Sequence, residues 1–222
     1  MERNINMDEI SDGKLYGAND MAKVGCDDCK GCSACCQGMG NSVVLDPYDV
    51  YRLTTGLSCK FEELLIDKLD LNVVEGIILP NLKMNGPKES CAFLDANGRC
   101  SIHSLRPGIC RIFPLGRIYE NGSFQYFIQV NECKKKDRTK VKVKKWIDTP
   151  DIAKNEAFIC RWHYFLKRLT DRMPTLTEEI VKQINMYILN ALFITLYEGD
   201  RDFYEQFEER IRAAEQFLKE IV

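Results

Sequence analysis

The residues in this sequence with the clearest capacity for chemistry are its 11 cysteines, about one residue in twenty. A cysteine thiolate is both a nucleophile and a soft metal ligand, so a set this dense needs a chemical reason. The odd count argues against a framework made only of disulfides. The cysteines lie at positions 26, 29, 32, 35, 36, 59, 91, 100, 110, 133 and 160.

Five of these cysteines fall within eleven residues, in the run Cys26–Cys36. Two intervening residues let a tight turn direct both sulfurs at one cation, so repeated C-x2-C spacing favours a metal site. Gly31 and Gly38 give the loop the backbone freedom to wrap around a metal. The run is not that of a bacterial ferredoxin, which ends x3-Cys-Pro, because Gln37 follows the last two adjacent cysteines.

The order of the cysteines and their neighbours resembles the YkgJ-like cysteine-cluster proteins, which are described as zinc- or iron-chelating domains. The family includes flagellin lysine-N-methylases, which are thought to carry an iron–sulfur cluster. One departure is His103, where the family commonly has tyrosine. The resemblance covers about half of the chain and rests on Cys29-x2-Cys32-x2-Cys35-Cys36, Cys91-x-Phe-Leu, Cys100-Ser-Ile, Arg106-Pro107-x2-Cys110-Arg111-x-Phe-Pro114 and Cys133.

The spacing and the resemblance together predict eight metal ligands and three spare thiols. The spare thiols are Cys26, Cys59 and Cys160, although Cys26 extends the C-x2-C series and is an alternative ligand. The adjacent Cys35 and Cys36 are expected to point apart and to serve different sites. The eight predicted ligands are Cys29, Cys32, Cys35, Cys36, Cys91, Cys100, Cys110 and Cys133.

The metal itself is left open between zinc and iron–sulfur, since both suit a set that is nearly free of histidine. The methylase relatives favour a 4Fe–4S cluster. A first site is expected to use Cys29, Cys32, Cys110 and either Cys35 or Cys36. The remaining cysteines would form a second site or act as resolving thiols.

Two arginines flank the third cysteine neighbourhood, Arg106 and Arg111. They could bind a substrate carboxylate or phosphate, or they could donate hydrogen bonds to cluster sulfurs or loop carbonyls. The supporting role is favoured because both lie within the ligand string. His103 is a candidate to replace one sulfur. The helical pair Cys160 and His163 is interpreted as packing rather than ligation.

Short hairpins should position the later cysteines. Asp95–Gly98 and Asn121-Gly122 each lie between strand-like segments and predict a β-hairpin. The first would bring Cys91 and Cys100 to the same end of two paired strands. The second hairpin would carry Cys133 back towards Cys110.

The segment between the two cysteine neighbourhoods is expected to carry two helices and a strand. Asp46–Asp49 predicts a capped helix start, and Gly56 its end. Ser58 is expected to cap a second helix with Cys59 in its first turn, where a thiolate is favoured. Val73–Leu79 is expected to form one strand.

Residues 150–222 are expected to be helical, with apolar residues at helical spacing over Asp151–Lys167. Pro174-Thr175-x-x-Glu178 predicts a capping box that opens a helix to about Tyr197. This helix is apolar almost all round in its second half, so it is either central or part of a dimer contact. A last stripe from Phe203 to Leu218 predicts core packing.

These elements predict an α+β fold, in which a small cysteine-rich domain of hairpins and helices precedes a helical region packed on it. The basic run 134–145 holds eight basic residues and one acidic residue. It is interpreted as a solvated loop and an exposed edge strand rather than as a patch for an anionic partner. The expected boundaries are a polar lead-in at 1–23, a cysteine-cluster metal-binding domain at 24–135, a basic connector at 136–149 and the helical region at 150–222.

Composition narrows the function classes further. Hydrophobic residues make up 45% and charged residues 29%, which excludes disorder, and the net charge of -2 argues against nucleic-acid binding. Met1–Val24 has no apolar signal region, and Met186–Tyr197 is too short to span a bilayer. A cytoplasmic protein with a protein partner or substrate is therefore expected, and a homodimer through the C-terminal helices is an alternative.

Two hypotheses of different classes follow. The first is a structural or redox module that binds iron–sulfur or zinc. The second is a lysine-N-methyltransferase-like enzyme that would also need S-adenosylmethionine, and no catalytic residue is assigned for it. The metal-binding module is favoured for two reasons. The sequence has no glycine-rich motif for S-adenosylmethionine or a nucleotide, and it lacks the C-x3-C-x2-C motif of radical S-adenosylmethionine enzymes.

Overall fold

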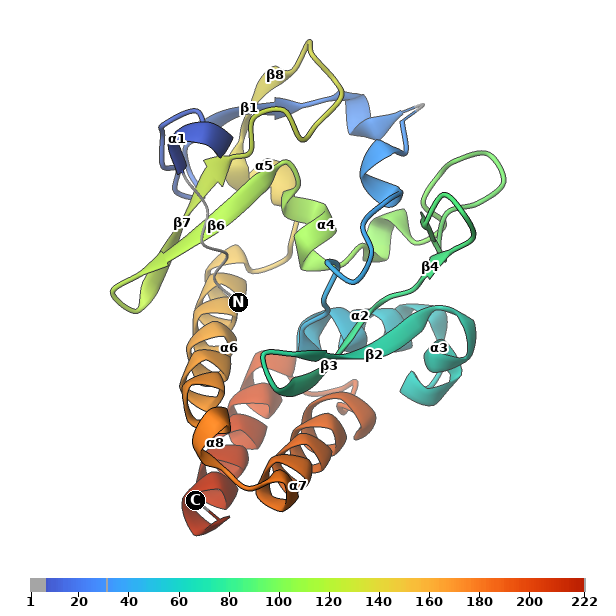
Figure 1. The fold of residues 1–222 in the computed structure, drawn as a ribbon. Helices are drawn as coiled ribbons and strands as arrows, with labels where there is room; N and C mark the ends of the chain where they lie inside the picture. Colours follow the sequence, from blue (N-terminus) through green and yellow to red (C-terminus); the bar gives the residue numbers. More distant parts are fainter. Residues whose placement is uncertain (1–6, 31, 222) are drawn as a thin grey trace. The chain divides into compact units, whose positions relative to one another are not determined.

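The computed structural model describes residues 7–30 and 32–221, which form two compact units, each with its own core. The observed mixture of short antiparallel hairpins and helices is α+β, as predicted (Figure 1). Unit one comprises the described residues up to Gly40 and Met84–Arg161, and unit two comprises Asn41–Lys83 and the described residues from Trp162. The boundaries expected from the sequence are continuous, whereas these units interleave along the chain.

The described residues of unit one form three two-stranded antiparallel sheets and short helices. The sheets pair β1 with β8, β4 with β5, and β6 with β7. The elements are α1 (Met7–Ile10), β1 (Met21–Gly25), β4 (Met84–Asn85), β5 (Ser90–Cys91), α4 (Gly108–Ile112), β6 (Leu115–Glu120), β7 (Ser123–Ile128), β8 (Thr139–Lys142), α5 (Val143–Ile147) and the first half of α6 (Ile152–Arg172).

The predicted hairpin at Asn121-Gly122 is confirmed. Asn121 and Gly122 have φ values of 50° and 79°, which a two-residue turn between right-twisted strands requires. The strands pair from Leu115 opposite Ile128 to the turn. The sequence pattern predicts that the first strand starts at Ile112. It starts instead at Leu115, because Ile112 is the last residue of α4.

The core of unit one lies where this hairpin, the β1–β8 pair, α4 and α5 meet. The Trp146 indole closes it by donating a hydrogen bond to the Phe113 carbonyl at 3.1 Å. The fully packed residues are Ala22, Val24, Ile112, Leu115, Tyr126, Ile128, Val143 and Ile147. These side chains hold the strands whose ends carry the cysteines.

The turn predicted at Asp95–Gly98 is also present. One carboxylate oxygen of Asp95 accepts hydrogen bonds from the backbone N–H groups of Asn97 and Arg99, each at 2.8 Å. Gly98 has a φ of 71°, and Leu94 bridges Cys100 in antiparallel fashion. A single bridge pairs the two flanking segments, so hydrogen bonds from the backbone to the Asp95 side chain fix the shape of this turn.

In unit two, the part of the chain that the structure describes contains one two-stranded sheet and most of the helices. Its elements are α2 (Pro47–Leu57), α3 (Phe61–Asp67), β2 (Leu69–Val74), β3 (Ile77–Leu82), the second half of α6, α7 (Glu178–Leu189), a π-helical turn at Asn190–Ile194 and α8 (Phe203–Ile221). The expectation of one strand over Val73–Leu79 is wrong. Glu75 and Gly76 have positive φ values of 51° and 85° and turn the chain into a β2–β3 hairpin.

The start of α2 is confirmed, but the prediction for α3 needs correction. The Asp46 side chain caps α2 by accepting from the Asp49 N–H at 2.8 Å. Ser58 ends α2 in the left-handed conformation instead of capping α3. Because α3 begins only at Phe61, Cys59 precedes the helix, and burial raises the pKa of its thiol.

The last helices differ from the predicted ones at their ends. Thr177, and not Thr175, caps α7 by accepting from the Ile180 N–H. The α-helix ends at Leu189 and gives way to a π-helical turn at Asn190–Ile194, and Arg210 of α8 donates hydrogen bonds to the backbone carbonyls of Ala191, Thr195 and Leu196. The predicted continuous helix to Tyr197 is therefore interrupted.

Residues 41–83 join the C-terminal helices through specific contacts. Asn185 of α7 accepts from the Ile78 N–H at 2.7 Å and donates to the Gly76 carbonyl at 3.0 Å. Phe61 of α3 packs against Phe193. Unit two is thus held by a buried amide and an aromatic core.

Candidate metal centre

Five cysteines line one small cavity in unit one. The cavity has a volume of about 20 Å³. The five cysteines come from two segments far apart in sequence, the first cysteine loop and the stretch that follows the β6–β7 hairpin. Its cysteines are Cys26, Cys29, Cys32, Cys35 and Cys133, and its other lining residues are Ala34, Phe113, Pro114, Glu132, Lys134 and Lys135.

Two of these sulfurs are already close together. The Sγ atoms of Cys26 and Cys29 lie 3.5 Å apart, and Cys26 is only 7% exposed. Burial, together with the neighbouring Cys26 thiol, raises the pKa of Cys29 to about 12. Without a cation Cys29 is therefore held as a neutral thiol, and a metal would have to displace its proton.

A second group of cysteines adjoins the first. The Cys36 thiol donates a hydrogen bond to Cys35, which lowers the pKa of Cys35 to about 7 and raises that of Cys36. Cys100 and Cys110 are near enough to raise the pKa of Cys36 further. The expectation that Cys35 and Cys36 point apart is therefore wrong, although Cys35 alone of the two lines the cavity.

Arg106 places a positive charge among the two groups. After the hydrogen bond from Cys36, the Arg106 guanidinium helps to lower the pKa of Cys35, and it opposes the burial that raises the pKa values of Cys29 and Cys100. The Nε atom of Arg106 is buried and has no hydrogen-bond partner among the described residues. A buried donor of this kind beside thiols matches the role of a group that hydrogen-bonds to metal-bound sulfur.

Arg111 has a different position, with its side chain 4% exposed. Its guanidinium donates hydrogen bonds to the carbonyls of Arg106 at 3.0 Å and Asp148 at 2.7 Å, and also to that of Ser104. Arg111 therefore ties the cysteine-bearing turn to the end of α5 through backbone oxygens. Hydrogen bonding to loop carbonyls is one of the roles that the sequence predicts for Arg111.

Several predicted or spare residues do not line the cavity. Cys91 is buried on β5, and His103 lies in the short helical turn His103–Leu105; neither lines the cavity. Cys160 lies on α6, where burial and Glu156 raise the pKa of its thiol. Cys59 belongs to unit two.

The donor chemistry fits a thiolate-bound metal. A tetrahedral ion with metal–sulfur distances of about 2.3 Å separates its sulfurs by roughly 3.8 Å, close to the Cys26–Cys29 distance. Within residues 7–30 and 32–221, no three His, Cys, Asp or Glu side chains converge closely enough to hold a metal as they stand. A metal would therefore have to draw at least one further sulfur towards this pair.

Cys26 is the residue that the sequence interpretation undervalued. The sequence predicts it as a spare thiol, with ligation as the alternative, because the C-x2-C-x2-C-C pattern of the family begins only at Cys29. The signal was available, since Cys26, Cys29, Cys32 and Cys35 form an unbroken series with two residues between members. Only the fold shows that the first member turns into the same cavity as Cys133.

The fold and this cavity define a cysteine-rich protein of the metal-chelating class. Residues 28–147, more than half of the chain, match the model of the CxxCxxCC family, described as a "putative zinc- or iron-chelating domain". The chain belongs to this family. Comparisons with curated proteins and with solved structures found no match. The family description names chelation and no reaction, so it lends the methylase alternative no support.

Among the described residues, no helix is both long enough and apolar enough to cross a membrane.

Proposed function

We propose that this protein is a metal-binding module whose principal centre forms in the five-cysteine cavity. The observation that carries the proposal is the meeting of Cys26, Cys29, Cys32, Cys35 and Cys133 around one cavity. Four thiolates from this set would complete a tetrahedral site. The sequence predicts Cys110 as a ligand of the first site. In the proposed centre Cys133 replaces it, because Cys133 lines the cavity and Cys110 does not.

The proposed centre has one ion, zinc or iron. A cavity of about 20 Å³ accommodates an object the size of a single water or ion. The sulfurs of Cys26 and Cys29, 3.5 Å apart, suit ligands of one ion. A four-iron cluster spreads its cysteine sulfurs farther apart, because irons and sulfides lie between them.

The neighbouring charges support a centre with negative charge. Four thiolates around a divalent ion carry a net charge of about −2. Lys134 and Lys135 line the cavity, and the guanidinium of Arg106 lies close to Cys29 and Cys35. These cations would stabilise the thiolates once their protons have left.

The centre would act first as a cross-link. It would join the first cysteine loop to the residue that follows the β6–β7 hairpin, more than ninety positions later in the chain. Zinc in this position would be structural, whereas iron would add one-electron chemistry. Cys36, Cys100 and Cys110 are the proposed ligands of a second, adjoining site, with Cys91 as the predicted ligand that the geometry supports least.

Anaerobic purification followed by metal and acid-labile sulfide analysis tests the proposal. We expect about one equivalent of zinc or iron, without sulfide, that is lost from Cys29→Ser and Cys133→Ser. Cys59→Ser and Cys160→Ser are matched controls, since both remove a thiol that does not line the cavity, and they should keep the metal. Stoichiometric sulfide with a brown chromophore would replace the single ion by the iron–sulfur cluster that the family resemblance favours, and a metal-free protein would refute the proposal.

A further inference from the structure

A second cavity lies in unit two, between the C-terminal half of α6 and α8, and has a volume of about 350 Å³. None of the residues that line it is a cysteine. The residues that line it are Phe165, Arg168, Leu169, Arg172, Leu176, Glu215, Leu218 and Lys219. Its size is within the range of small-molecule sites in proteins.

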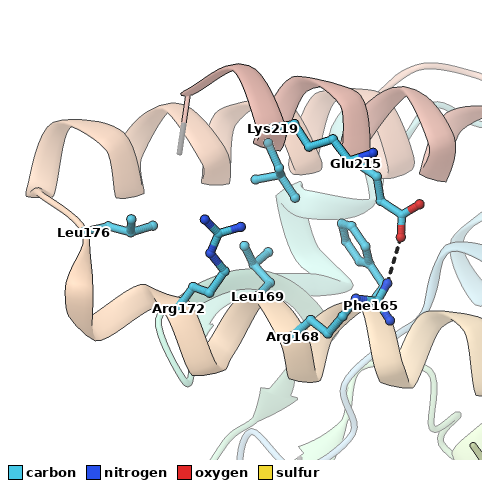
Figure 2. A pocket seen from close by; sticks show the side chains of 8 residues that line it. Phe165, Arg168, Leu169, Arg172, Leu176, Glu215 and Lys219 are labelled. Atoms are coloured by element: carbon cyan, nitrogen blue, oxygen red, sulfur yellow. Dashed lines mark hydrogen bonds and ion pairs between the residues drawn. The ribbon is translucent and has the colours of Figure 1, made fainter.

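The floor of this cavity and one of its ends are apolar. Phe165 and Leu169 of α6 are 2% and 3% exposed and form its base. Leu218 of α8 and Leu176, which precedes α7, are partly exposed side chains on its wall. Figure 2 shows Leu176 at one end of the cavity and Phe165 towards the other. The cavity thus offers an elongated apolar surface for a chain.

The charged residues at the cavity carry a surplus of positive charge. Arg168 pairs at 2.7 Å with Glu215, the one acidic side chain that the described residues contribute to the lining. Figure 2 shows this pair at one end, while Arg172 reaches from α6 into the space between the helices. Among the described residues, no hydrogen bond or ion pair engages the charged groups of Arg172 or Lys219.

We propose that the α6–α8 cavity binds a single-chain amphiphile with one anionic head group. The apolar floor would take the tail, and Arg172 and Lys219 would take the head. A guanidinium binds carboxylates and phosphates through paired donors, which suits Arg172 to either head group. The cavity, with a volume of about 350 Å³, is within the size range of small-molecule sites, and decanoate is a probe with one anionic head group and a single apolar chain.

Calorimetric titration of the full-length protein with decanoate tests this proposal. We expect saturable binding to one site, weakened at least tenfold by Arg172→Glu combined with Lys219→Glu. Lys182→Glu is the matched control, because Lys182 is an exposed cation of the same unit that does not line the cavity, and it should bind as the wild type does. Acetate, which lacks a tail, and 1-decanol, which lacks a charge, should each bind at least tenfold more weakly.

A variant that fills the cavity provides an independent measurement. Leu218→Trp should abolish decanoate binding while the circular dichroism spectrum and metal content stay unchanged. The proposal is wrong if decanoate does not bind, or if the charge-reversal and Leu218→Trp variants bind it as the wild type does. It is also wrong if sedimentation shows a dimer that the same variants dissociate, because the cavity would then be an interface between two copies. None of these outcomes depends on the metal centre.

Discussion

The cysteine loop of unit one and the helical core of unit two bury their residues to very different extents. No described residue of the stretch from Cys29 to Gln37 is fully buried. In unit two, by contrast, Phe61, Phe165 and Phe207 are each 2% exposed or less. Apolar burial can hold the helices together, but it cannot hold the loop. The loop needs a cross-link of another kind, and its cysteines are suited to provide one.

The largest expected effect is that of removing the metal. Chelation should abolish the ordered structure of the cysteine loop and of the segment around Cys133, because thiolate sites form only on folding and are worth about 10 kcal/mol. The helices of unit two should persist. Hydrogen exchange resolved by peptide, together with far-ultraviolet circular dichroism and metal analysis, measures both parts. A metal-free protein that keeps its full thermal transition and its native exchange pattern would contradict the contrast between the two regions.

The converse experiment disturbs the apolar core and leaves the cysteines untouched. Phe207→Ala should lower the free energy of unfolding by about 3–5 kcal/mol, since it opens a cavity between packed aromatic rings. Met186→Ala serves as the control, because Met186 is 58% exposed and its loss should change stability by about 0.5 kcal/mol or less. Urea denaturation measures the change. Metal content should stay constant, and a parallel loss of metal would show that the two regions are not independent.

The two arginines of unit one provide a sharper test within the cysteine region. Arg111→Met should cost about 1–3 kcal/mol, because it leaves buried carbonyls without their donor. Arg106→Met should cost less stability but should weaken metal binding about tenfold or more, because the thiolates of Cys29 and Cys35 lose a nearby cation. Thermal denaturation and competition for the metal with a chelator separate the two effects. If both variants behave alike, the assignment of separate roles is wrong.

The smallest expected effect concerns the β1–β8 pair. Lys23 lies directly opposite Lys140, and both are exposed. Like charges opposite one another destabilise a sheet, so Lys23→Glu should raise the free energy of unfolding by about 0.2–1 kcal/mol. The gain should shrink at 1 M salt, where charges are screened. Lys144→Glu, on α5 outside the strand pair, is the control, and an equal gain from it would point to net charge instead of pairing.

Local turn chemistry was the most predictable part of the fold. Asn121-Gly122 and the Asp46 cap succeed because a few adjacent residues dictate their backbone geometry. The Glu75-Gly76 turn was missed because apolar residues continue through it on both sides, which hid two strands in one run. The end of α7 was missed for another reason, since Arg210, which binds the carbonyls beyond it, lies on α8.

The cysteine spacing by itself determined that this chain carries a metal-chelating region, because five thiols within eleven residues have few other physical uses. It did not determine which sulfurs meet. That pairing depends on hairpins and on the buried Arg111, which bring segments distant in sequence to one place. Only the tertiary structure placed Cys26 and Cys133 in one cavity, left Cys59 and Cys160 out of its lining, and joined residues 41–83 to the C-terminal helices. Ligand types are local properties of a sequence, whereas convergence of ligands is a property of the folded chain.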